Sequence, residues 1–332
     1  MYSDEDLAAA VKAKILSADS VAAFRAFMAE QRQSAVADEE QFRLVTSFND
    51  VFVTIACALV FWAASSFGVP LLLKALVIAA GAWALAEYFT RQRRMALPSI
   101  VLLIGFIGGS FAALSDLLFM LTENEAARWP FVLAGLATTG LGVGHWLRFR
   151  VPITIAAIAA VLVGVFVTLV TMVLDEAPNA LWFVAGLAVL AAALYYDASD
   201  RLRETRRADV GFWLHMLAAP LLVHPIFTAA VFDIEGTPGL GGAALVVAMY
   251  LLIAIFALGI DRRALMVSAL GYVFYALNEL LTAGGTITLD FAVTAMLIGG
   301  FLLLLSAFWQ NARGLVMRVC PENIRAYLPP AG

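Results

Sequence analysis

The stretch from Val151 to Leu174 reads VPITIAAIAAVLVGVFVTLVTMVL and contains no charged residue. An α-helix rises about 1.5 Å per residue, so a run of this length covers the ~30 Å hydrocarbon core of a bilayer. The stretch therefore predicts a membrane-spanning helix.

Runs of the same kind recur along the chain. Its 332 residues are 63% hydrophobic and 14% charged, whereas a soluble domain has roughly 45–50% apolar and 25% charged residues. A soluble protein of this size would have to hide every run in one core, which a compact core cannot do. We therefore expect an all-α polytopic membrane helix bundle with about ten transmembrane helices. The predicted spans are 50–67, 69–88, 97–119, 130–147, 151–174, 179–196, 210–232, 240–260, 264–283 and 290–309.

The connections between these spans alternate in charge. One side collects 19 of the 21 basic residues, while the other side has Arg128 alone, and Lys74 lies within the second span. The positive-inside rule makes the basic side cytoplasmic. A wrong number of spans would move later basic loops to the other side, so the alternation supports ten. It predicts a protein of the bacterial cytoplasmic (inner) membrane with both termini in the cytoplasm.

Composition divides the chain into three parts. Residues 1–48 are polar and predict a small helical cytoplasmic segment without a cleavable signal peptide. Residues 49–310 form the transmembrane domain, and residues 311–332 form a cytoplasmic C-terminal tail. Cys57 and Cys320 give neither a disulfide framework nor a zinc spacing.

A loose repeat of roughly 50 residues runs through the transmembrane part. Several even-numbered spans end in an aromatic residue followed by a basic one, as at Trp146 and Arg148. Duplication of a helical hairpin would produce this pattern. The alternative is that aromatic residues and arginines are common wherever a span reaches the cytoplasm.

Ionisable residues inside spans are functional candidates, because each costs ~2.5–3.5 kcal/mol on insertion scales. One set lies beyond the midplane, at similar depth, and could close a polar cavity for a substrate or protons. Pro220 and Pro225 flank His224 and suggest a broken helix there. Alternatively, Lys74 snorkels outward, Asp116 caps or pairs nearby, and His224 is a satisfied core histidine. This outer set consists of Lys74, Asp116, His224, Asn278 and Glu279.

A second set lies near the cytoplasmic ends of the spans. Its mixed signs suggest internal ion pairs, and its arginines could bind phosphate from anionic lipid headgroups or a nucleotide. The alternative is a positive-inside anchor with salt bridges. This inner set consists of Glu87, His145, Asp197, Arg201, Arg207, Asp209 and His215.

Motifs of metal or nucleophilic chemistry are missing from the sequence. His215 and His224 are nine residues apart and therefore face opposite sides of one helix. No His-x-x-x-His, cysteine cluster, Gly-x-Ser-x-Gly or phosphate loop occurs. We expect no metal and no cofactor, the lipid bilayer as the main partner, and no nucleic acid. The missing motifs also disfavour an enzyme.

Four runs carry a resemblance to known proteins: Ala13 to Ser17, Phe42 to Asp50, Arg206 to His215 and Ile260 to Ser268. In these runs the chain resembles a family of uncharacterised bacterial multi-spanning membrane proteins, known only as a domain of unknown function. The resemblance implies a short helical N-terminal cytoplasmic segment followed by many spans. It implies no mechanism, because the family's motifs carry no known activity.

Three functions fit these observations. The first is a transporter-like protein that moves a small solute or a lipid, coupled to protons through Asp116, Glu279 and His224. The second is a membrane-embedded enzyme that acts on a lipid-linked or phosphorylated substrate, with His145 or His215 as base. The third is a non-catalytic accessory or sensor protein. The first hypothesis requires that the side chains of the outer set line one cavity.

Overall fold

The computed structural model describes residues 7, 10–24, 48–122, 127–174, 178–201, 203, 205–232, 240–283, 290–325 and 327–329, with backbone alone at 229–232, 240–243, 264, 275–283, 290, 291 and 324. The chain forms two compact units, Met1–Phe42 and Arg43–Gly332. In the first unit, residues 10–12 and 18–24 are helical. The backbone N–H of Ser20 donates to the Ser17 hydroxyl over 3.0 Å, so Ser17 caps the second of these helices.

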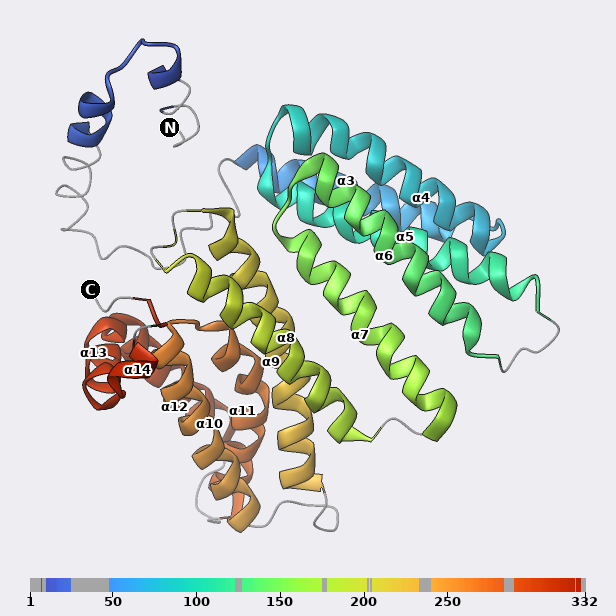
Figure 1. Cartoon of the computed structure of the whole chain (residues 1–332). Coiled ribbons are helices and arrows are strands. Elements are labelled where there is room, and N and C mark those ends of the chain that lie inside the picture. Colours follow the sequence, from blue (N-terminus) through green and yellow to red (C-terminus); the bar gives the residue numbers. More distant parts are fainter. Residues whose placement is uncertain are drawn as a thin grey trace. The chain divides into compact units, whose positions relative to one another are not determined.

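The second unit is helical, and the described residues contain no strand (Figure 1). The predicted all-α class is therefore confirmed. A six-residue π-helical segment, η1, continues α4 at its end. The elements are α3 Phe48–Ser66, α4 Leu71–Ala86, η1 Glu87–Gln92, α5 Ala96–Phe119, α6 Trp129–Phe149, α7 Ile153–Leu174, α8 Asn179–Ser199, α9 Arg206–Phe232, α10 Leu240–Ile260, α11 Ala264–Ala283, α12 Asp290–Ala307, α13 Trp309–Val319 and α14 Glu322–Arg325.

Within the described residues, six helices are long and apolar enough to cross a membrane. The protein is therefore a multi-pass helical membrane protein. A bent pair, Ala292–Ala307 with Trp309–Val319, supplies a further candidate, and α10 and α11 contain the shorter apolar runs Ala244–Ile260 and Leu265–Phe274. Helix α6 is not among the six, and its residues include Thr138, Thr139, His145 and Arg148. The six helices are Phe48–Ser66, Leu71–Gln92, Ala96–Phe119, Ile153–Leu174, Asn179–Ser199 and Arg206–Thr228.

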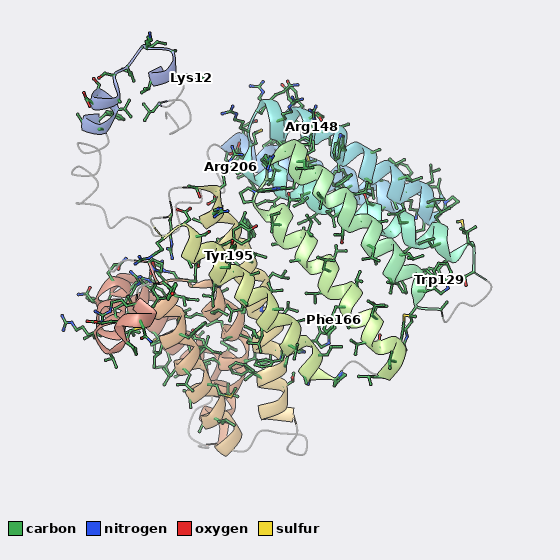
Figure 2. The ribbon with its side chains drawn as sticks, in the orientation of Figure 1. Lys12, Trp129, Arg148, Phe166, Tyr195 and Arg206 are labelled. Carbon is green, nitrogen blue, oxygen red and sulfur yellow. The ribbon has the colours of Figure 1, made fainter. Side chains whose placement is uncertain are left out.

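Large apolar side chains stand on the outside of these helices. Trp62, Val173 and Leu303 are 70%, 81% and 74% exposed, and Figure 2 shows carbon side chains projecting along the lengths of the helices. A soluble protein rarely exposes contiguous apolar surface on this scale. In a bilayer the same surface faces lipid and needs no protein partner.

Consecutive helices pack as hairpins: α4 on α5, α6 on α7, α8 on α9, and α10 on α11. Each of these turns contains a residue with positive φ, namely Arg94 (54°), Arg150 (56°), Arg203 (55°) and Asp261 (59°). A left-handed residue just past a helix reverses the chain, and the next helix begins two or three residues later. These four positions are 53 to 58 residues apart. A helical hairpin is thus the repeating structural unit.

The hairpins assemble into two groups. In the first, α5 packs against α3, α4, α6 and α7; in the second, α9 packs against α8, α10 and α11. The groups meet where α7 lies against α8 and α9 (Figure 1). This contact is apolar and includes the buried Ala156 with Ile155, Ala159 and Val163 of α7.

Helix α9 runs without a break through Pro220 and Pro225. The interruption suggested by the sequence is therefore absent from this described helix. The Thr228 hydroxyl donates to the carbonyl of His224 over 2.8 Å.

The C-terminal part is folded rather than extended. Helix α13 packs against α10 and buries Trp309, Arg313 and Met317. The last predicted span reached residue 309, whereas α12 ends at Ala307 and Trp309 begins α13.

Two adjacent glycines of α5 provide a matched test of hairpin packing. A Cβ on Gly109 would lie 2.8 Å from the Ala75 carbonyl oxygen and 3.0 Å from the Ala79 nitrogen, whereas one on Gly108 would meet no atom within 4 Å. Both substitutions to Ala gain the same ~1 kcal/mol of helix propensity. We expect Gly109→Ala to lose ~1–3 kcal/mol relative to Gly108→Ala, because α4 must move away. Thermal unfolding in detergent measures this difference, and equal melting temperatures would contradict the close α4–α5 packing.

Candidate functional site

Asp116 of the outer set caps a helix. Its Oδ2 accepts a hydrogen bond from the backbone N–H of Leu72 over 2.9 Å. The last turn of α5 thereby satisfies a free N–H in the first turn of α4, where a carboxylate is also favoured by the helix dipole. Lys74 lies on the same first turn of α4 and is half-buried.

His224 lies in a different helix contact. Its Nδ1 is hydrogen-bonded to the hydroxyl of Tyr272, which joins α9 to α11. The Tyr272 ring stacks on Phe227 with the ring centroids 4.9 Å apart. Asp116 and His224 therefore have separate partners, one in the α4–α5 pair and one in the α9–α11 pair. The side chains of Asn278 and Glu279 lie outside the described part of the chain.

Glu87 of the inner set forms a partly exposed ion pair. Its two oxygens accept from Arg148 Nε over 2.7 Å and Nη2 over 3.0 Å, which is a bidentate arrangement. Arg91 adds a weaker contact of 3.3 Å from the same helix. The pair ties the end of α4 to the end of α6, so the basic ends of these two hairpins lie together. Figure 2 labels Arg148 at this end of α6 and Trp129 at the opposite end.

His145 is a core histidine. It is 1% exposed, and its Nδ1 lies 3.2 Å from the Thr154 hydroxyl of α7. Its ring packs on Phe106 and Phe149, with centroid distances of 5.5 and 4.6 Å. The surroundings are aromatic and closed, so His145 is not placed to reach a substrate.

Asp197 and His215 of the inner set lie together, beside an arginine that was not among the predicted site residues. His215 Nε2 is 2.8 Å from Asp197 Oδ2, and the ring has no exposed surface. Arg262 Nη2 and Nε lie 2.6 and 3.2 Å from the two Asp197 oxygens, and Nη2 also donates to the Ala208 carbonyl. Gly211 lies so close that a Cβ there would collide with the carboxylate. Asp197 is therefore held by two donors from two other elements.

The neighbouring Asp261 forms a second centre. Arg203 Nη1 lies 3.1 Å from Asp261 Oδ2, and Trp309 Nε1 donates to Oδ1 over 2.8 Å. Arg313 approaches the same carboxylate at 3.7 Å, and the guanidinium of Arg263 lies 4.8 Å from the centroid of the Trp309 ring. Asp261 thus links the α8–α9 turn, the α10–α11 turn and α13.

We call these side chains the buried charge network: Asp197, Arg203, His215, Asp261, Arg262, Trp309 and Arg313. Within it, two carboxylates face three guanidinium groups. Burial and the nearby Arg262 charge lower the pKa of Arg203, and the Asp261 carboxylate opposes them. The guanidinium stays charged, because its ordinary pKa lies above ~12.

The sequence pointed to Asp197 and His215 as site residues, but not to Arg262, which pairs with Asp197, or to Trp309, which binds the neighbouring Asp261. Arg262 looked like one more arginine of a basic turn, and Trp309 looked like an interfacial aromatic residue. One signal was available: Asp261 is an acidic residue in a very short, otherwise basic turn between two apolar spans. A carboxylate there is out of place unless it pairs with the arginines around it.

The remaining inner residues lie at the rim of this network. Arg201 Nε donates to the carbonyl of Leu328 over 3.1 Å, which holds the C-terminal residues against the α8–α9 turn. Arg207 is exposed on the first turn of α9, and Asp209 is half-buried on the same turn.

The buried charge network can link helices to one another through its ion pairs. Among the described residues, no three His, Cys, Asp or Glu side chains come together as a metal site. A general base must reach the proton it abstracts, but His215 is completely buried. The network therefore fixes helices α8, α9, α10, α11 and α13 at one end.

Breaking this network should cost far more than breaking an exposed pair. Arg262→Met leaves the buried Asp197 charge without its arginine, so we expect a loss of ~3–5 kcal/mol. The control Arg148→Met removes the partly exposed partner of Glu87 and should cost ~0–1 kcal/mol. Unfolding of both variants in the same detergent measures the difference. Equal losses would show that Asp197 does not depend on Arg262.

The chain was compared with models of protein families, with curated proteins and with solved structures, and none of them matches it.

Proposed function

We propose that this protein is a transporter-like protein of the bacterial cytoplasmic membrane that moves a small solute or a lipid. The proposal has two parts, a topology and a mechanism of movement, and each is supported by a different feature.

The proposed topology has ten crossings with both termini in the cytoplasm. Within the described residues, each of the ten helices α3 to α12 overlaps one predicted span. Ion pairs also link basic ends that the charge pattern assigns to one side: Glu87 with Arg148, and Arg203 with Asp261. The helix ends that the charge pattern assigns to the other side are also linked to one another. Asp116 accepts from the Leu72 N–H, and Asn179 donates to the Thr228 hydroxyl over 3.0 Å.

The mechanism rests on the contact between the two helix groups. They meet mainly through α7 against α8 and α9, and the apolar cluster there combines small residues such as Ala156 and Ala218 with aromatic ones such as Trp213. Such surfaces permit close approach and lack the fixed geometry of ion pairs. Rocking of one bundle against another is a common way to alternate access.

Proton coupling would use the His224–Tyr272 contact inside the second group. The Asp116 carboxylate, by contrast, is engaged as a helix cap. The partner of the cytoplasmic arginines in this proposal is the layer of anionic lipid headgroups.

Reporter fusions test the topology. Alkaline phosphatase fused after Leu174 should be active, because the enzyme folds only outside the cytoplasm, and the same reporter fused after Arg203 should be inactive. A fluorescent protein fused after Gly332 should fluoresce. Phosphatase activity at both internal positions, or a dark C-terminal fusion, would contradict the ten-crossing arrangement.

Distances between spin labels test the motion. With Cys57 and Cys320 replaced, labels at Arg94→Cys and Arg207→Cys report on the two groups in phospholipid vesicles. We expect at least two distance populations whose ratio changes between acidic and alkaline buffer. Labels at Arg94→Cys and Arg150→Cys, both in the first group, provide the control and should give one unchanged distance. A single narrow distance for the first pair under all conditions would reject rocking.

A further inference from the structure

Helix α13 leaves the last apolar helix at a steep angle. Helix α12 ends at Ala307, and Trp309–Val319 follows with a bend of 74°. If α12 crosses a bilayer, a helix bent by this angle lies close to the plane of its surface. The bend occurs at the basic end of the second group, since Trp309 contacts Asp261 of the α10–α11 turn.

One face of α13 is fixed to the protein. Trp309, Arg313 and Met317 recur every fourth residue and are 2%, 1% and 5% exposed. Trp309 donates to Asp261, and Arg313 Nη2 donates to the carbonyl of Pro329 over 2.6 Å. The orientation of α13 about its own axis is therefore set by the buried charge network.

The rest of the surface of α13 is divided into an apolar and a polar stripe. Leu315 and Val319 fall on one stripe at ~100° per residue and are 62% and 85% exposed, and Phe308, which directly precedes α13, is 57% exposed. Asn311 and Arg318 are seven residues apart and form the neighbouring exposed stripe. The helix contains no acidic residue.

We propose that α13 is an interfacial helix that binds the anionic lipid surface of the cytoplasmic leaflet. Phe308, Leu315 and Val319 insert below the headgroups, while Arg318 pairs with lipid phosphate at their level. A protein anchor, an apolar stripe and a basic stripe suit a helix lying between protein, hydrocarbon and water. Charge selects the lipid, because the exposed charge is positive and the cytoplasmic leaflet is anionic. This inference rests on the proposed topology, in which α12 crosses the membrane and its basic end is cytoplasmic, but it does not need transport.

The position of the apolar stripe can be measured with a fluorescent probe. The full chain, with Cys57→Ala and Cys320→Ser, is labelled with bimane at Leu315→Cys, Val319→Cys or Asn311→Cys in vesicles of phosphatidylcholine and phosphatidylglycerol. Shallow lipid-attached nitroxide should quench the probes at positions 315 and 319 at least about twofold more than the probe at 311. Aqueous iodide should show the reverse order.

Two outcomes of this measurement would overturn the proposal. Equal quenching by iodide at all three positions would place α13 in water. Protection of positions 315 and 319 from both quenchers would place another protein chain, such as a second copy, on the stripe.

The role of Arg318 can be tested by lipid charge. Short-chain phosphatidylglycerol should raise the thermal stability of the detergent-solubilised protein, and Arg318→Gln should weaken its apparent affinity about fivefold. Arg318→Lys should retain most of the effect, because it keeps the charge. Phosphatidylcholine is the matched neutral lipid. The same affinity for both lipids, or an unchanged affinity in Arg318→Gln, would exclude Arg318 as the anionic lipid contact.

Discussion

The short turns between paired helices constrain everything else in this structure. Each turn reverses the chain at one left-handed residue, so the next helix must run back along the previous one. An arginine or an aspartate takes this conformation at a cost of roughly 1–2 kcal/mol, which close packing of the hairpin must exceed. Because these turns pair consecutive helices in the same way, charges from different hairpins reach the same end of their helix group. The ion pairs exist because the turns bring their members together.

The two helix groups use this arrangement differently. In the first, the basic ends are joined by a partly exposed pair between Glu87 and Arg148, while His145 packs in an aromatic core. In the second, Asp197 and Asp261 are buried and each is held by several donors. Buried pairs lose much more than exposed ones when a partner is removed. The second group is therefore cross-linked at this end by buried ion pairs, whereas its contact with α7 is apolar.

Hydropathy and the side preference of arginine were enough to predict the all-helical class and the positions of most helices. The same signals predict how far along its helix a residue lies, but they do not predict in which direction around the helix axis its side chain faces. The sequence predicts a comparable depth for Asp116 and His224, yet their partners lie in different helix pairs. Asp197 and Arg262 are 65 residues apart and meet only because hairpins pack side by side. A one-dimensional pattern contains no information on that packing, so Arg262 and Trp309 were missed as partners of Asp197 and Asp261.

The hairpin unit also bears on how such a chain enters a membrane during synthesis. A pair of apolar helices joined by a short charged turn can leave the translocon together, with the turn kept on the ribosome side. Peptide groups are then already bonded within each helix when they meet hydrocarbon. Asp261 follows Arg203 in the chain and can pair with it at once, whereas Asp197 acquires Arg262 only after the hairpin of α10 and α11 has followed that of α8 and α9. The order of synthesis therefore delays the pairing of Asp197 with its arginine until the second of these hairpins has been made.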